Sequence, residues 1–407
     1  MVVLFHLTPL VFLGVLLACT CHVVVGAGMP ATFIFGDSLV DAGNNNYIVS
    51  LSKANYPPNG IDFDGHQPTG RYTNGRTIVD ILAQEMGMGG FVPPYMAPET
   101  AGDILLKGVN YASGGGGILN QTGSIFVSTL NSSFFRVKYL LCFSFQKEKE
   151  KNFSLVLFQC ARSRGGRINL DAQIDNYANN RHELITRHGE VAAVTLLRGA
   201  LFSVTMGSND FINNYLTPIF SVPERAVTPP EAFVNAVIAK YRQQLIRLYL
   251  LDARKIVVAN VGPIGCIPYL RDTTPSAGAA CAEFPNQLAR SFNRKLRGLV
   301  DELSANLTGS RFLYADVYRI VSDIIANYKS NGFEVADSAC CYVSGRFGGL
   351  LPCGPTSQYC ADRSKYVFWD PYHPSDAANA LIARRIIDGE PEDISPINVR
   401  QLITSSN

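Results

Sequence analysis

An aspartate and a histidine stand three residues apart near the C-terminal end of the sequence, in the stretch YVFWDPYHPSDAANALIARRII. Pro371 and Pro374 stiffen the loop, and Ser375 is a suitable N-cap for the alanine-rich helix that the pattern predicts next. A short rigid turn can bring the carboxylate of Asp370 to one imidazole nitrogen of His373, which fixes the tautomer and stabilises the imidazolium. The other nitrogen then faces outward, so we predict that His373 acts as a general base.

A serine that could use this base lies near the other end of the chain, in ATFIFGDSLVDAGNNN, which begins at Ala31. The apolar, strand-like run ends abruptly at Gly-Asp-Ser, so Ser38 is expected at the end of a strand. A serine hydroxyl is a weak nucleophile near neutral pH unless an adjacent base takes its proton. Ser38 is therefore the candidate nucleophile, with His373 as the base that activates it.

Acyl transfer also needs donors for the oxyanion that develops in the transition state. Three sources are present: the backbone N–H of Ser38, the glycines 114–117 of NYASGGGG, and the side-chain amide of Asn209 in GSND. Taken singly, the glycine run is typical of a flexible turn and Asn209 of a turn or helix cap. Together with the Asp-His pair, these motifs form a complete set for acyl transfer.

Other chemistries lack their motifs. His66 lies in a glycine-rich loop, and His182 and His188 lie in the polar helix predicted over NNRHELITRHGE, so we expect these three to be structural or exposed. HELITRH does not have the H-E-x-x-H spacing of a zinc site, and no G-x-S-x-G elbow occurs. The glycine run lacks the features of a phosphate-binding loop or a dinucleotide fingerprint. We therefore expect no metal and no cofactor.

The elements that must position these residues alternate along the chain. Five strand-like runs each end in turn residues: 32–38, 108–113, 200–210, 254–262 and 311–318. Amphipathic helical patterns lie between them, for example over 75–87, 229–253 and 284–307. Such alternation predicts a parallel sheet with helices on both faces, which binds ligands outside the carboxyl ends of its strands. Ser38, Ser113 and Asn209 each follow a predicted strand.

Composition is that of an ordinary globular chain. The 407 residues are 47% apolar and 17% charged, with a net charge of +2 and scattered lysine and arginine. This balance predicts neither nucleic-acid binding nor a strongly acidic partner, and it says nothing of oligomeric state.

The N-terminal stretch is long, apolar and uncharged, and small residues follow it. We interpret residues 1–26 as a secretory signal peptide cut near Gly26, with an uncleaved membrane anchor as the alternative. No later segment is apolar enough to span a bilayer, so we expect one domain over 27–407 and no membrane span after cleavage. Secretion to the apoplast or cell wall is expected, with the vacuole as an alternative. Sequons at Asn120, Asn131, Asn152 and Asn306 fit this route, and we predict glycosylation at Asn120 and Asn306.

Six cysteines remain outside the signal and the unusual segment described next: Cys266, Cys281, Cys340, Cys341, Cys353 and Cys360. An even number in a secreted chain predicts disulfides, whose pairing cannot be deduced from the sequence. A zinc site is the alternative, but the adjacent pair Cys340-Cys341 does not have the spacing of a zinc knuckle.

Residues 127–164 differ from their surroundings. A lysine-glutamate cluster stands between two phenylalanine-rich apolar stretches, without a helical or strand period. We interpret this segment as a translated retained intron or an error in the gene model. A genuine insertion loop is the alternative.

Several ordered blocks of this sequence resemble the plant GDSL esterase/lipase family of the SGNH hydrolases. FIFGDSLVDAGNNN is similar to the family's first block, VNYASGGGGIL to its second, GSNDFINNY to its third and FWDPYHPSDAAN to its fifth. The resemblance runs from about Ala31 to the C-terminus, apart from residues 127–164. It implies a three-layer α/β/α sandwich with a five-stranded, mostly parallel sheet.

The resemblance also implies the roles of the site residues. Ser38 would be the nucleophile, His373 the base and Asp370 its partner. The oxyanion hole would comprise the N–H of Ser38, Asn209 and a glycine of the second block, for which we choose Gly115 before Gly116.

The expected function is that of a secreted serine esterase or lipase acting on lipid or small-molecule esters, without a cofactor. An acyltransferase on the same fold is an alternative, because only the acceptor of the acyl group differs. A non-catalytic secreted binding protein is a second alternative, which the intact set of site residues disfavours.

Overall fold

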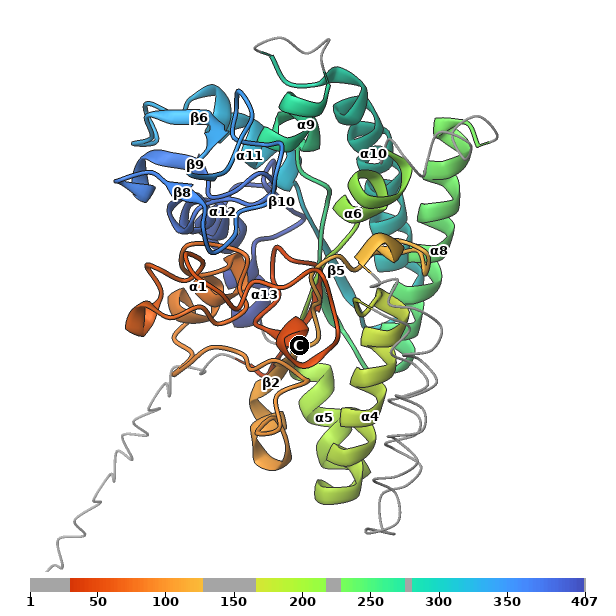
Figure 1. Ribbon diagram of the computed structural model, residues 1–407. Helices are drawn as coiled ribbons and strands as arrows, with labels where there is room; N and C mark the ends of the chain where they lie inside the picture. The colour runs from red at the N-terminus through yellow and green to blue at the C-terminus, as the bar shows by residue number, and fades with distance from the viewer. Residues whose placement is uncertain (1–29, 127–165, 217–227, 275–279, 406–407) are drawn as a thin grey trace, which may run out of the picture.

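The computed structural model describes residues 30–126, 166–216, 228–274 and 280–405 (Figure 1). The predicted signal peptide, residues 1–26, and the unusual segment, residues 127–164, lie outside these ranges. Within them, no helix has both the length and the apolar character that crossing a membrane requires.

The centre of the molecule is a six-stranded sheet in the order β10-β5-β4-β3-β1-β2. Its strands are β1 (Thr32–Gly36), β2 (Gly108–Asn110), β3 (Leu201–Thr205), β4 (Lys255–Ala259), β5 (Arg311–Ala315) and β10 (Ile394–Ser395). The five parallel strands are those that the sequence predicts, in continuous register from β2 to β5.

The predicted count of five strands misses β10, which pairs antiparallel with β5. This strand has only two residues, Ile394 and Ser395, so it is too short to show the alternating pattern by which strands are recognised. The class of fold is nevertheless the predicted one.

Helices cover both faces of the sheet (Figure 1). On one side lie α4 (Leu170–His188), α8 (Pro230–Leu250) and α10 (Glu283–Asn306), with α8 packed against both α4 and α10. On the other lie α1 (Ile78–Glu85), α11 (Val317–Ala326), α12 (Asp376–Asp388) and α13 (Val399–Thr404), with α12 in contact with the other three. The three-layer α/β/α prediction is therefore confirmed.

The other α-helices and strands are short. They are α5 (Glu190–Gly199), α6 (Ser208–Asp210), α9 (Pro268–Thr273), β6 (Val335–Ala339), β7 (Cys341–Tyr342), β8 (Gln358–Tyr359) and β9 (Tyr366–Phe368).

Aromatic side chains form the centre of the core between the sheet and α4. The ring of Phe35 stacks on Tyr111 at 5.0 Å between centroids, and Phe33 stacks on Phe202 at 5.2 Å. Tyr177 of α4 meets the Phe35 and Phe202 rings edge-on. All five side chains are buried, so they anchor the strands whose ends carry the candidate site.

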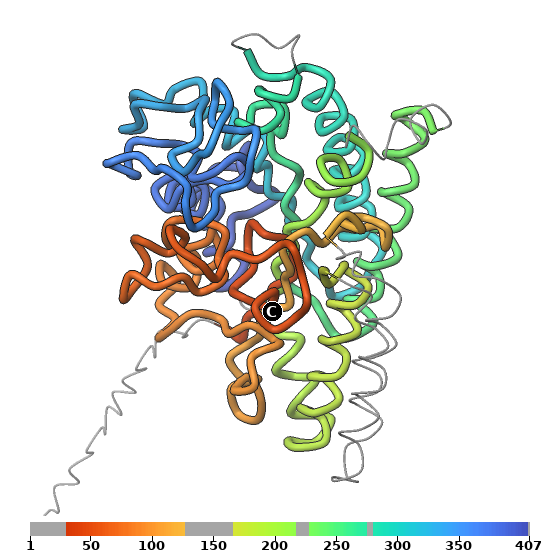
Figure 2. The backbone as a smooth tube through the Cα atoms, in the orientation of Figure 1, coloured from red at the N-terminus to blue at the C-terminus, as the bar shows by residue number. Residues whose placement is uncertain are grey.

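The N-terminal and C-terminal parts of the described chain pack against each other. Figure 2 shows the red and orange N-terminal part beside the blue C-terminal part, in agreement with the packing of α1 on α12. The backbone N–H of Arg76 and its guanidinium both donate to the carboxylate of Asp376, the first residue of α12. The predicted N-cap is also present, because the Ser375 hydroxyl accepts the N–H of Ala378.

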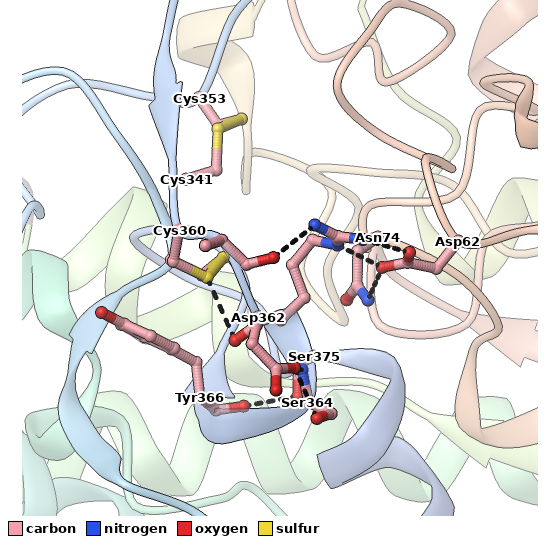
Figure 3. The surroundings of a disulfide bond; sticks show 12 residues. Asp62, Asn74, Cys341, Cys353, Cys360, Asp362, Ser364, Tyr366 and Ser375 are labelled. Carbon is pink, nitrogen blue, oxygen red and sulfur yellow. Dashed lines mark hydrogen bonds and ion pairs between the residues drawn. A yellow bond between two sulfur atoms is a disulfide. The ribbon is translucent and has the colours of Figure 1, made fainter.

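All six cysteines of the described residues form disulfides: Cys266–Cys281, Cys340–Cys360 and Cys341–Cys353. The zinc alternative therefore does not apply to them. Figure 3 shows the Cys341–Cys353 bond near Cys360, Tyr366 and Ser375, whose hydroxyl donates to the Tyr366 carbonyl at 2.7 Å. Two disulfides thus crosslink the region that precedes the Asp-His loop.

Candidate active site

The Asp370–His373 loop connects β9 to α12 and closes on itself. Oδ1 of Asp370 accepts the backbone N–H groups of Tyr372 and His373, each at 2.8 Å. The Trp369 N–H donates to the His373 carbonyl at 2.8 Å, and the Cys341 N–H donates to the Trp369 carbonyl at 2.6 Å. These bonds fix the position of the Asp370 carboxylate independently of the imidazole. They also connect the loop to strand β7, which is crosslinked by disulfides.

The imidazole of His373 lies between Asp370 and Ser38. Its Nδ1 is 2.8 Å from both carboxylate oxygens of Asp370, and its Nε2 is 2.8 Å from Oγ of Ser38. With the proton on Nδ1, facing the carboxylate, Nε2 is free to accept the Ser38 hydroxyl proton. Asp370 and His373 are buried, whereas Ser38 is partly exposed. Ser38 is therefore the residue of these three that a substrate can reach.

Ser38 follows directly from the end of β1. The preceding N–H, that of Asp37, donates to the carbonyl of Thr205 at the end of β3 at 3.2 Å. Oδ1 of Asp37 accepts the N–H of Leu39 at 3.0 Å, which closes a tight turn around the serine. The sheet therefore presents Ser38 at its carboxyl edge, as expected for a ligand site in a parallel sheet.

The glycine run after β2 contains one N–H group that faces no internal acceptor. The other three donate at 2.9–3.0 Å: Gly114 to Asp41, Gly116 to the Ser113 carbonyl and Gly117 to Asn169. Within the described residues, the N–H of Gly115 has no acceptor, and neither has that of Ser38. Gly115 has a φ of +80°, a conformation that favours glycine.

The carboxamide of Asn209, in α6, is held at both ends. Its Nδ2 donates to the Gly116 carbonyl at 2.9 Å, and its Oδ1 accepts from Nδ2 of Asn213 at 2.5 Å. The amide nitrogen carries two hydrogens, so one donor remains after the bond to Gly116. Asn213 is a supporting residue that the sequence pattern does not single out.

The structure brings the predicted residues together. Ser38, Gly115, Asn209, Asp370 and His373 all line one cavity of about 310 Å³, and Gly116 does not. Much of the remaining wall is apolar, with contributions from Leu39, Phe126, Met206, Ile212, Ile264 and Phe368. The arrangement combines a nucleophile, a base and free N–H donors beside an apolar surface.

The three other histidines that the structure describes lie outside this cavity and are exposed, in agreement with the prediction that they are structural or exposed. His66 is exposed and its Nδ1 is 2.7 Å from the carbonyl of Ile61, while His182 and His188 lie on the exposed face of α4. In the part of the chain that the structure describes, no cluster of histidine, cysteine and acidic side chains could hold a metal.

Two buried aspartates hold the glycine loop, and sequence reasoning did not identify them. Asp41 accepts the N–H of Gly114 at 3.0 Å through Oδ2, and Asp210 accepts the N–H groups of Ile118 and Leu119 at 2.9 Å. Gly115 lies between these anchored points. The available signal was position alone, since both aspartates belong to the motifs that contain Ser38 and Asn209.

Burial dominates the electrostatics of three aspartates near the site. It raises the pKa of Asp37 to about 7, and those of Asp41 and Asp210 to about 6, against an ordinary value of 3.8. Backbone N–H donors oppose the rise in each case, and the nearby His373 opposes it for Asp37. Oδ2 of Asp37 is buried without a hydrogen-bond partner among the described residues.

Comparison with known proteins gives one consistent family. The model of the GDSL-like lipase/acylhydrolase family matches residues 32–386. One GDSL esterase/lipase of Arabidopsis thaliana is 54% identical over 379 residues, which cover 93% of this chain and 92% of the relative. A second from the same organism is 45% identical over 380 residues, covering 93% of this chain and 88% of the relative.

Proposed function

Because the chain belongs to the GDSL-like lipase/acylhydrolase family and is therefore a hydrolase acting on ester bonds, we propose that it cleaves carboxylic esters through an acyl-enzyme on Ser38. The observation that carries this proposal is the continuous chain of hydrogen bonds from Asp370 through His373 to Ser38. No other hydroxyl or thiol side chain is hydrogen-bonded to His373 in the described part of the chain.

The first half-reaction forms the acyl-enzyme. Nε2 of His373 takes the hydroxyl proton as Oγ of Ser38 attacks the ester carbonyl, and a tetrahedral oxyanion forms. Asp370 holds the imidazole in the required tautomer and stabilises the imidazolium. When the intermediate collapses, the C–O bond to the alcohol breaks and His373 returns the proton to the departing oxygen.

The oxyanion is bound by the N–H groups of Ser38 and Gly115 and by the remaining amide hydrogen of Asn209. The free donors at these positions support this assignment, and the internal bond made by the Gly116 N–H favours Gly115 over Gly116. A preorganised donor of this kind contributes about 3–4 kcal/mol to transition-state stabilisation.

The second half-reaction releases the acid. Water enters where the alcohol has left, His373 takes one of its protons, and the hydroxyl attacks the acyl carbonyl of Ser38. Collapse of the second intermediate breaks the bond to Oγ, and His373 returns the proton to Ser38. The cycle consumes one ester and one water and yields one acid and one alcohol, with no cofactor required.

The apolar wall of the cavity supports the proposal that the substrate is an ester of a lipid or of an acylated small molecule. Met206, Ile264 and Phe368 are buried side chains that reach the same cavity as Ser38. Burial of each methylene of an acyl chain against such a wall contributes about 0.8 kcal/mol.

We also propose that the protein follows the secretory route to the apoplast or cell wall. Three disulfides support this, because disulfides persist in oxidising compartments. Asn120 and Asn306 are both exposed and therefore accessible to glycosylation. The signal peptide at residues 1–26 completes this proposal.

The test is hydrolysis of p-nitrophenyl butyrate at pH 8 by the purified protein and by the Ser38→Ala variant. We expect kcat to fall by about 10⁴-fold or more, because the loss of one triad residue abolishes the function of all three. Ser291→Ala, a serine on α10 outside the cavity, is the matched control and keeps full activity.

Two readouts separate the possible outcomes. An organophosphonate probe should label the wild type and Ser291→Ala but not Ser38→Ala, and absence of labelling in the folded wild type would overturn the proposal. Turnover with a competing alcohol identifies the acceptor: free acid as the main product supports the hydrolase, and a new ester as the main product identifies an acyltransferase.

A further inference from the structure

A second, open groove of about 390 Å³ lies beside the active-site cavity, between α10 and the end of β5. Its lining includes Arg290, Arg294, Arg297, Tyr314, Tyr318 and Asn260. Asn260 follows β4 and also lines the cavity that contains Ser38, so the two spaces share a wall at this residue. The proposed ester chemistry makes no use of the three arginines.

The arginines occupy one face of α10, at positions i, i+4 and i+7. Arg290 donates to Glu283 at 2.6 Å and to the Tyr318 hydroxyl at 3.0 Å. Arg294 is exposed and Arg297 partly so, and neither contacts an acidic side chain in the described residues. Like charges at this spacing disfavour a helix, so the row has an electrostatic cost that one acidic partner offsets only in part.

Several other arginines of the described chain are paired with acidic side chains, in contrast to Arg294 and Arg297. Arg76, Arg181 and Arg385, on the same molecule, each make an ion pair with an aspartate at 2.8 Å or less. Arg294 and Arg297 both line the groove, and among the described residues neither guanidinium, with its five N–H donors, has a hydrogen-bond acceptor. A guanidinium with free donors matches the geometry of a carboxylate or phosphate.

Aromatic and amide groups form the rest of the groove and are already satisfied. The guanidinium of Arg297 lies 4.7 Å above the Tyr314 ring, and Asn260 donates to the Tyr314 hydroxyl at 2.7 Å. The side-chain Oδ1 of Asn260 accepts the backbone N–H of Tyr318 at 2.9 Å. These contacts hold the tyrosines in place without using the free donors of Arg294 and Arg297.

One acidic side chain, Asp316, also lines the groove. Its Oδ1 accepts from Asn260 at 2.8 Å and from the backbone N–H of Arg319 at 2.9 Å, where it caps α11. It is therefore committed to the helix cap and does not pair with Arg294 or Arg297. Arg290 is paired with Glu283, so Arg294 and Arg297 face the single negative charge of Asp316, and the groove keeps a net positive charge.

We propose that this groove is a binding site for a small organic anion, of the size of a sugar acid or a sugar phosphate. Arg294 and Arg297 would hold its carboxylate or phosphate by charge-assisted hydrogen bonds, and the partly exposed Tyr318 would contact its ring. The proposal does not depend on the ester chemistry, because binding is measured without turnover.

Calorimetric titration of the full secreted chain at low salt tests the site with three probes: D-galacturonate, D-galactose 1-phosphate and neutral D-galactose. We expect at least one of the two anions to bind about tenfold or more tightly than galactose, and 0.5 M NaCl to weaken that binding, because salt screens exposed charges. The anion that binds more tightly identifies the preferred group.

The double variant Arg294→Gln/Arg297→Gln should lose about tenfold or more of this affinity and keep its melting temperature within a few degrees. Arg346→Gln is the matched control, because Arg346 is an exposed arginine outside the groove that contacts only an aromatic ring, that of Phe347, among the described residues. Equal binding of galactose and both anions would overturn the proposal. So would equal loss of anion binding in the control, or unchanged binding in the double variant.

Discussion

The carboxylates around Ser38 serve different purposes. Asp370 is buried, and its carboxylate is hydrogen-bonded by two backbone N–H groups and by the imidazole of His373. Asp37 is buried with one oxygen that lacks a partner among the described residues, which favours its neutral form. At the scale of single residues, the number of hydrogen-bond donors around each carboxylate therefore distinguishes Asp370, the partner of the base, from Asp37, which forms a turn.

The Asp37→Asn variant should be more stable than the wild type at pH 8. Burial raises the pKa of Asp37 to about 7 in the folded protein, above its ordinary value of 3.8, so the folded state holds this proton more tightly. The stability that this provides is complete below pH 4 and is lost as the pH rises through 7. Asparagine does not ionise and can still accept the Leu39 N–H.

Urea unfolding at pH 5 and pH 8 measures this effect. We expect the difference in free energy of unfolding between variant and wild type to grow by about 1–4 kcal/mol from the lower to the higher pH. Asp64→Asn, at an exposed position, serves as the control. A difference that is the same at both pH values would show that Asp37 does not ionise in this range.

At the scale of elements, the conformation of the glycine run 114–117 after β2 depends on a positive φ and on close contacts. A Cβ on Gly115 would lie 2.6 Å from a ring carbon of Phe126, and its φ of +80° strains any residue with a side chain. Asp41 and Asp210 hold the loop on either side, so it has little freedom to relieve such a clash. The free Gly115 N–H is thus a product of loop geometry.

Gly115→Ala should therefore lower kcat/KM for p-nitrophenyl butyrate by about 10²-fold, because a small displacement of an oxyanion donor has a large effect. The matched control is Gly298→Ala, since Gly298 lies inside α10 with open space at its Cβ position. Alanine should raise helix stability there by about 1 kcal/mol and leave kcat/KM unchanged. A folded Gly115→Ala protein with wild-type kcat/KM would remove this glycine from the oxyanion hole.

At the scale of the whole molecule, the two flanks of residues 127–165 return to one short stretch of chain. The Leu51 N–H donates to the Phe126 carbonyl at 3.4 Å, and the Gly166 N–H donates to the Val49 carbonyl at 3.0 Å. The points where the chain leaves and re-enters the described structure are therefore held near each other. A short connection could join them, which supports the proposal that residues 127–164 are not part of the normal protein.

Replacing residues 127–164 with two glycines should give a folded protein. We expect its melting temperature to equal or exceed that of the full chain, because a shorter loop costs less closure entropy. Its Ser38-dependent turnover should be at least as high, since Phe126 and Gly115 line the same cavity. Calorimetry and p-nitrophenyl butyrate hydrolysis, with Ser38→Ala in the shortened chain as control, measure both. Aggregation or loss of turnover would show that the segment is an integral loop.

Local signals in the sequence were enough for much of this protein. Five strands, the long helices, the N-cap at Ser375 and the turn from Asp370 to His373 each depend on residues close together in the chain. Periodicity, capping and proline act over such short distances, so their patterns can be interpreted without a structure. The choice of Ser38 and His373 as partners followed from chemistry, since a serine nucleophile requires a base.

Contacts between distant residues were decided only by the tertiary structure. Ser38 and His373 are 335 residues apart, and parallel strands with crossover helices bring them to the same edge of the sheet. The disulfide pairing, the strand β10 and the free N–H of Gly115 likewise depend on which segments pack together. The arginine groove also requires α10 to lie against the end of β5. Sequence periodicity specifies which face of an element is buried, but packing determines which neighbour that face meets.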